Sequence, residues 1–149
     1  MTANAWVIYD EFRELCADGT MDLDADTFNL GLYLSTSNAA TVTLSGRAAL
    51  TNQVASAFGY TQPGQALDNV TWTKSGSTVT FTSDAEVFTA SGGSITARFG
   101  VIDDDTVAAP VTDPLVCYSL LDNSPADVTA TDGNTLTITM HANGIFTLT

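Results

Sequence analysis

Positive charge is scarce in this sequence of 149 residues, which has four lysines and arginines against 17 aspartates and glutamates and a formal net charge of −13. Such a chain repels phosphate groups, so we expect neither nucleic acid nor an anionic membrane as a partner. Only 14% of the residues are charged, and the polar surface must therefore consist mainly of uncharged side chains, above all 24 threonines. This composition favours a protein that packs against neighbouring subunits, with adaptation to a salty habitat as the alternative interpretation.

Long hydrophobic runs and paired cysteines are also lacking. No apolar run approaches the roughly 20 residues that a membrane-spanning helix needs, and the N-terminal segment has no basic stretch typical of a signal peptide. Cys16 and Cys117 both stand among apolar residues, which indicates buried thiols in preference to a disulfide. With 44% hydrophobic residues and no linker or repeat, the chain is predicted to form one domain over residues 1–149.

Catalytic motifs are not recognisable. His141 is the single histidine, and it has no cysteine or histidine at ligand spacing, so we interpret it as a surface or edge residue. The sequence shows neither a nucleophile elbow nor a phosphate-binding loop. A small hydrolase would need a catalytic base that the sequence does not reveal, although two carboxylates could still meet in space. We therefore expect no enzyme, no catalytic residue and no cofactor.

Two acidic clusters are weak candidates for calcium binding. The first resembles the start of a calcium loop but has Thr27 where an EF-hand needs glycine and Tyr33 where it needs glutamate. Solvated loops with aspartate caps are the simpler interpretation, so no metal site is assigned. The candidate ligands are Asp22, Asp24, Asp26, Asp103, Asp104 and Asp105.

Helical periodicity is clearest near the N-terminus. Apolar residues at a spacing close to 3.6 predict an amphipathic helix over 5–17, with Asn4 as N-cap and Gly19 as stop. Its buried face is expected to consist of Trp6, Ile8, Phe12 and Leu15. A short second helix is predicted near 47–57, because alanine and glutamine favour helix there, and Gly59 would end it.

Strand periodicity dominates the remainder. Alternating apolar residues predict about seven strands and hence a mainly β, antiparallel sandwich or barrel-like fold. The terminal hairpin would turn at Asn143-Gly144. The predicted segments are a strand at 28–34, a hairpin at 70–81 around Ser75-Gly76, strands at 94–102 and 114–121, and a terminal hairpin over 134–149.

The stretch "GYTQPGQAL" at 59–67 places an aromatic residue between two backbone breakers. The glycines and Pro63 would fix a turn that presents Tyr60 rigidly and leads into a strand. Such a turn could be a docking element or a joint between layers, or Tyr60 could simply fill the local core. The interface candidates are Tyr60, Pro63 and Trp72, and Tyr33 joins Tyr60 and Trp72 as a candidate for glycan stacking.

The order of the motifs resembles a family of small virion structural proteins of tailed bacteriophages. Family members share an N-terminal "Y-x-x-F" helix, a "GYT-x-G-G-x-x-L" turn, an "ITAR" strand and a "GIF-x-L" terminus. The corresponding segments here are "YDEF", "GYTQPGQAL", "ITARFGVIDDDT" and "GIFTLT", with Pro63-Gly64 in place of the more usual Gly-Gly. The resemblance covers nearly the whole chain and implies no catalytic residue.

The resemblance implies a non-enzymatic role in the virion. We expect a capsid decoration, or cement, protein that binds the major capsid protein on the outer surface of the head, because the acidic charge disfavours contact with packaged DNA. Capsid geometry then suggests a homotrimer at three-fold positions. The alternative is a tail or fibre-associated structural or receptor-binding protein.

Overall fold

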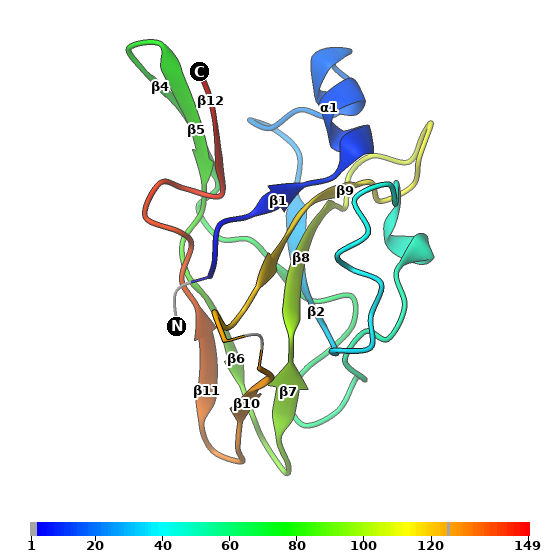
Figure 1. The fold of residues 1–149 in the computed structure, drawn as a ribbon, viewed down its shortest axis with the longest axis vertical. Coiled ribbons are helices and arrows are strands. Elements are labelled where there is room, and N and C mark those ends of the chain that lie inside the picture. The colour runs from blue at the N-terminus through cyan, green and yellow to red at the C-terminus, as the bar shows by residue number, and fades with distance from the viewer. Residues whose placement is uncertain (1–2, 125) are drawn as a thin grey trace.

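The computed structural model describes residues 3–124 and 126–149 and is mainly β, with one α-helix (Figure 1). Its largest sheet has five strands in the order β1-β9-β8-β2-β3, all antiparallel. We call these five strands the body sheet. Their bounds are β1 Val7–Ile8, β2 Phe28–Tyr33, β3 Gln65–Ala66, β8 Phe99–Asp104 and β9 Leu115–Leu120.

Three smaller antiparallel sheets complete the fold, which is that of a β-sandwich-like single domain, as predicted. β12 pairs with β5, β5 with β4, β11 with β6, and β10 with β7. Their bounds are β4 Thr71–Ser75, β5 Thr78–Thr82, β6 Glu86–Thr89, β7 Ile95–Ala97, β10 Val128–Ala130, β11 Thr135–Ile138 and β12 Phe146–Leu148.

The N-terminal helix is shorter than predicted. α1 spans Asp10–Ala17, and the residues before it form β1, which pairs with the middle of β9. Phe12 and Leu15 are buried on the helix as expected. Trp6 is also buried, but from the extended segment ahead of β1, so the predicted helix over 5–17 and its Asn4 cap are wrong. The long-range pairing with β9 outweighs the local helical pattern.

The second helix is a single 3₁₀ turn at Arg47–Ala49. Beyond it the chain runs extended beside β2, where the backbone N–H of Val54 donates to the Leu32 carbonyl and Leu34 N–H donates to Asn52. The predicted helix therefore ends after three residues, because the strand edge offers its backbone groups better partners.

The terminal hairpin was predicted with the wrong partners. Its two segments form β11 and β12 as expected, but β11 pairs with β6 and β12 pairs with β5. The turn at Gly144, with φ of 83°, therefore carries the chain from one sheet to another. The predicted strand over 94–102 likewise divides at Arg98 into β7 and β8, which belong to different sheets. Strands that change sheets are a regular way of forming corners in sandwiches.

The stretch at 59–64 is a tight joint between layers. Gly59 has φ of 90°, and an added Cβ would lie 2.0 Å from the Thr89 carbonyl oxygen. Gly64 approaches β2 equally closely, because its Cβ would lie 2.1 Å from the Leu30 carbonyl oxygen. Between them Tyr60 is 2% exposed, and its hydroxyl accepts a hydrogen bond from the Leu32 N–H at 3.0 Å. The two glycines thus let the chain contact two sheets, while Tyr60 fixes its distance from β2.

Candidate interaction surface

The three-stranded sheet of β4, β5 and β12, which we call the arm, extends away from the rest of the fold on the side of α1 (Figure 1). Alternation along its strands and the pairing register separate two faces. The inner face carries Trp72, Lys74, Val79, Phe81, Phe146 and Leu148. The outer face carries hydroxyl side chains alone, from Thr71, Thr73, Ser75, Thr78, Thr80, Thr82 and Thr147.

Aromatic side chains hold the root of the arm against the rest of the molecule. Phe81 and Phe146 stack with centroids 5.1 Å apart, and Trp72 contacts both rings. Phe146 also meets Phe12 of α1 edge-on at 5.2 Å, and Phe81 meets Phe28 of β2 in the same manner. The root is therefore fixed to both the helix and the body sheet.

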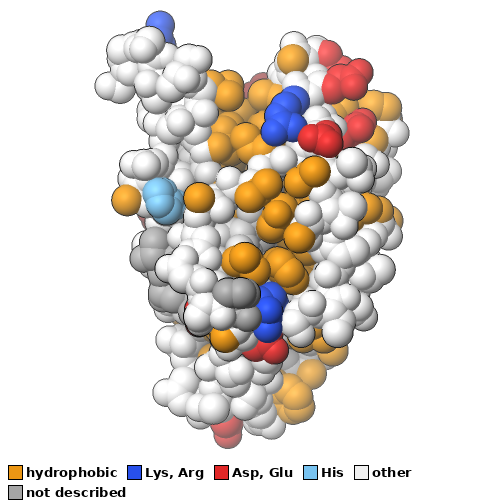
Figure 2. Space-filling view, viewed as in Figure 1, with side chains coloured by type: hydrophobic (Ala, Val, Ile, Leu, Met, Phe, Trp, Pro, Cys, Tyr) orange, Lys and Arg blue, Asp and Glu red, His pale blue; other side chains and the backbone are white. Residues whose placement is uncertain are grey.

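The distal half of the inner face stands clear of α1 and leaves an apolar groove. Two hollows, of about 430 and 320 Å³, lie along it and share Cys16 and Leu148. Figure 2 shows hydrophobic side chains in the depression between the arm and the helix. Leu148 is 45% exposed although it points toward this groove. The groove is lined by Ile8, Phe12, Met21, Leu23, Trp72 and Leu148, with Arg13, Cys16 and Asp22 among the other lining residues.

Charge is distributed unevenly between the arm and the rest of the chain. The segments 69–83 and 133–149 contain no aspartate or glutamate, so all 17 acids lie elsewhere. Among the described residues each arginine forms an ion pair with aspartate, whereas Lys74 of the arm forms none. The arm is therefore a nearly neutral element, with one free cation, on a strongly acidic protein.

The predicted interface candidates are not brought together. Tyr60 is buried in the joint described above, which corrects its assignment as a contact residue, because its ring cannot reach a partner. Pro63 is half-buried, and its carbonyl accepts a hydrogen bond from Gln53 at 2.6 Å. Trp72 is half-buried and lines the groove. Only Trp72 is placed where a partner could touch it together with an apolar surface.

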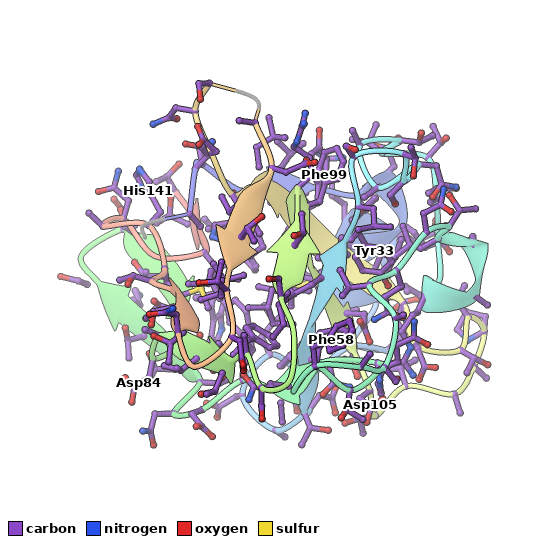
Figure 3. The ribbon with its side chains drawn as sticks, turned by 90° about the horizontal axis from the view of Figure 1, so that it is seen from below. Tyr33, Phe58, Asp84, Phe99, Asp105 and His141 are labelled. Carbon is purple, nitrogen blue, oxygen red and sulfur yellow. The ribbon has the colours of Figure 1, made fainter. Side chains whose placement is uncertain are left out.

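The aromatic residues considered for glycan stacking do not form an exposed platform. Tyr33 is 1% exposed and packs in a small separate core with Tyr9 and Leu115. The exposed aromatic residue is instead Phe58, which the sequence reasoning missed (Figure 3). Its φ is 55°, and its ring lies on Gly93, where an added Cβ would be 2.3 Å from Cδ1. Among the described residues, no other aromatic ring pairs with Phe58.

One acidic cluster forms an ion-pair cage around Arg47. The guanidinium donates to Asp103 and Asp113 at 2.6 Å each and to Asp105 at 3.1 Å. Asp103 is fully buried, and its Oδ1 has no hydrogen-bond partner among the described residues. Burial raises the pKa of Asp103 to about 7, because the attraction of Arg47 offsets only part of the desolvation. Arg47 thus ties the 3₁₀ turn to the end of β8.

The neighbouring carboxyl, Asp104, connects the two acidic clusters. Its Oδ1 accepts hydrogen bonds from the N–H groups of Thr106 and Val107 at 2.7 and 3.1 Å. Its buried Oδ2 has no donor among the described residues, and the carboxyl faces that of Asp26. Burial, with the charge of Asp26 added, raises the pKa of Asp104 to about 6. A proton on Asp104 would let its Oδ2 donate to the carboxylate of Asp26.

The calcium candidates do not form a metal centre. Asp22 and Asp24 are exposed, and the loop is held by hydrogen bonds from its own backbone, such as Asp22 N–H to Asp26 Oδ2 at 2.6 Å. Asp103 and Asp105 bind Arg47, as described. Within residues 3–124 and 126–149, no three histidine, cysteine or acidic side chains are grouped so that they could hold a metal ion. The structure therefore offers no geometry from which to assign calcium.

The histidine stands apart from the acidic clusters, whereas Cys16 lines the groove together with Asp22. His141 lies outside the strands, on the opposite side of the molecule from Asp105 (Figure 3), and its Nδ1 accepts a hydrogen bond from Asn143 N–H at 3.2 Å. Cys16 and Cys117 are free thiols, as predicted. Cys117 is fully buried and Cys16 is half-buried in the groove, and burial raises the pKa of both.

Comparison with known proteins gives no match. No protein-family model, curated protein or solved structure is similar to the chain. Among the described residues no helix has the length and apolar character needed to cross a bilayer. Functional inference therefore depends on the sequence resemblance and on the surfaces described above.

Proposed function

We propose that this chain is a non-enzymatic structural protein of a bacteriophage virion that binds the outer face of the capsid and stabilises it as a decoration protein. The observation that carries the proposal is the arm beside its apolar groove. A sheet with an uncharged outer face, open edges and apolar side chains exposed on its inner face is suited to contact with another protein. The ordered motifs that resemble phage virion proteins support the same role.

The distribution of charge supports a position on the outside of the head. If the chain lay inside the shell, its 17 acidic side chains would lie near packaged DNA, and the DNA phosphates would repel their carboxylates. On the outer face the acidic surface points to solvent, where it keeps particles apart. The nearly neutral arm is then the element that faces neighbouring subunits.

The proposed partners are the major capsid protein and further copies of this chain, most simply as a homotrimer. A closed ring of three copies matches the three-fold positions between capsomers. Binding at such positions links capsomers that otherwise meet only at their edges, which would explain how a small protein without a catalytic site stabilises a shell.

Cryo-electron microscopy of purified virions of the encoding phage tests the placement. We expect density for this fold on the outer surface of the head, with three copies around local three-fold positions. Density on the tail or a fibre would support the alternative role instead. Absence of the chain from the virion, or density inside the shell against DNA, would overturn the proposal.

A functional assay complements the image. Heads from a phage lacking this gene should be less resistant to heat or to chelation than wild-type heads, and addition of the purified protein should restore the resistance. Glycan binding by the isolated protein, with no binding to heads, would contradict the decoration role.

A further inference from the structure

Lys74 and Val79 form a mixed pair near the tip of the arm. They lie directly opposite each other on β4 and β5, so both side chains project from the inner face. Lys74 is exposed and Val79 is half-buried. Neither side chain completes the aromatic cluster at the root. The tip of the arm therefore presents an apolar group and an ammonium side by side.

The groove presents the complementary pair of surfaces. Its lining is mainly apolar, and Asp22 stands at its edge next to Met21 and Leu23. The Asp22 carboxylate is oriented, because its Oδ1 accepts the Asp24 N–H at 3.0 Å. Asp22 has no ion-pair partner among the described residues. Phe12, Met21 and Leu23 are buried at the base of the groove, so its accessible apolar surface comes from the exposed Leu148 and the half-buried Ile8 and Trp72. The groove thus combines this apolar surface with a carboxylate that has no ion pair.

We propose that the arm tip of one copy occupies the groove of the next copy, with Val79 against the apolar lining and the Lys74 ammonium paired with Asp22. This deepens the proposed function, on which its biological meaning rests, by assigning the contact between copies. Charge complementarity identifies the occupant: among the described residues Lys74 is the one lysine or arginine without an ion pair, and it stands on a segment without acids, so it can meet the Asp22 carboxylate of another copy.

The contact joins the tip of one copy to the groove of the next, and each copy offers both. Val79 lies opposite Leu148 on β12, so the tip continues the arm side of its own groove. Contacts of this kind generate a ring when the rotation between copies closes. Every copy in a closed ring would have its groove filled and its Lys74 paired. The resulting ring is the arrangement that a homotrimer at a three-fold position requires.

Charge reversal tests the ion pair in purified full-length protein. Sedimentation equilibrium of the wild type should show a defined oligomer. Lys74→Glu and Asp22→Lys should each weaken association about tenfold or more, because each reversal places like charges in contact. The double variant should recover most of the loss. Asp22→Asn keeps the side-chain oxygen that accepts the Asp24 N–H, and it should weaken association without disturbing the loop.

Asp24→Lys provides the matched control. It makes the same charge change in the same loop, but Asp24 does not line the groove, so association should stay within about twofold of wild type. Equal effects at Asp22 and Asp24 would show that only net charge matters and would overturn the pairing. A monomeric wild type at the highest attainable concentration would overturn the inference as well.

Disulfide trapping tests the geometry independently of charge. Cys16 lies in the groove and Ser77 lies at the tip, so Ser77→Cys should form a bond to Cys16 of the neighbouring copy under mild oxidation. Non-reducing electrophoresis should show a ladder that ends at the ring size. Thr131→Cys, an exposed hydroxyl at a remote turn, should give no such ladder. Comparable ladders from both variants, or none from Ser77→Cys, would refute the docking geometry.

The two proposals can fail separately. Loss of the oligomer in Lys74→Glu, with the wild-type chain absent from virions, would support the tip-to-groove contact and reject the decoration role. Wild-type oligomers that resist both the charge reversals and the trapping, with density on the outer head surface, would reject the contact alone.

Discussion

The body sheet and the arm are both antiparallel, yet they solve different problems. In the body sheet every residue of β2 and of β8 is buried, so both faces are covered and each central strand has a neighbour on either side. In the arm burial is confined to the root, and β4 and β12 are edge strands. The central strands of the body sheet have no free face or edge, whereas the arm has exposed faces and open edges that a partner can contact.

Sequence chemistry follows the same division. In β2 and β8 the register places Phe28, Leu30, Leu32 and Ile102 on one face and Tyr33, Phe99 and Val101 on the other, as a sheet covered on both sides requires. The outer face of the arm carries threonine and serine, which tolerate both water and a protein partner. Stability therefore depends mainly on the body sheet, and contact with partners depends on the arm. The following predictions test this division.

The largest effect is expected where the two regions meet. Phe12→Ala removes the edge contact with Phe146 and leaves a cavity at the root of the arm, so the free energy of unfolding should fall by about 3–5 kcal/mol. Urea denaturation measures the loss. Val7→Ala, an apolar truncation on exposed β1, is the control and should cost much less. Similar losses for both would show that α1 is only loosely attached.

Two leucine-to-alanine substitutions compare the body sheet with the arm directly. Leu32 of β2 is fully buried, and Leu32→Ala should lower the free energy of unfolding by about 2–5 kcal/mol. Leu148 of β12 is 45% exposed, and Leu148→Ala should cost the isolated chain less than about 1 kcal/mol. Thermal melts of dilute protein separate the two. A larger loss at Leu148 would show that the arm is part of the core.

The pH dependence of stability should arise from the body sheet. Burial raises the pKa of Asp103 to about 7 and of Asp104 to about 6, from an ordinary value of 3.8. The folded state therefore binds these protons more tightly than the unfolded chain does. Their stabilisation is complete below about pH 4 and is lost as the pH rises through 6 and 7.

Asp104→Asn isolates one of the two groups. The amide oxygen can still accept from Thr106 and Val107 N–H, and the amide nitrogen can donate to Asp26. The variant should be more stable than wild type at pH 8, by about 1–3 kcal/mol, and should show a weaker pH dependence. Asp24→Asn, on the exposed part of the acidic loop, is the control. An unchanged pH profile in Asp104→Asn would contradict the raised pKa of Asp104.

The smallest effect is expected at His141. Among the described residues its side chain has one hydrogen bond, from a turn N–H at the surface, so His141→Ala should change the free energy of unfolding by no more than about 0.5 kcal/mol. If the chain is the proposed decoration protein, its incorporation into virions should also be unchanged. A folded variant that is lost from particles, or that abolishes a detectable turnover, would contradict a non-enzymatic role.

The sequence predicted where strands lie better than it predicted which strands pair with each other. The buried strand β2, the strand β9 and the hairpin β4–β5 were found because alternation and turn residues are local signals. The C-terminal segments were recognised as strands but assigned to each other. Alternation shows that a segment is a strand, and it contains no information about which distant edge has unpaired backbone groups.

The candidate site was accessible only in part. Trp72 was recognised as a contact candidate by its chemistry, but the groove is made by α1, the loop after it and the arm, which no local pattern brings together. Lys74 and Leu148 were missed for that reason. One signal was available, since Lys74 is the single lysine of a strongly acidic chain and lies in a segment, 69–83, that has no aspartate or glutamate.

The pairing of β2 with β8 also fixes the order in which the protein can be completed during synthesis. About seventy residues separate these partners, and β1 must wait still longer for β9. Until that later part of the chain has left the ribosome, β2 has one open edge, because only its other edge can pair with the segment at 52–54 and with β3. The nascent chain therefore exposes an unpaired strand edge to aggregation for longer than a fold built from neighbouring hairpins, because distant pairings form slowly. Expression at lower temperature, with chaperones in excess, should accordingly raise the soluble yield.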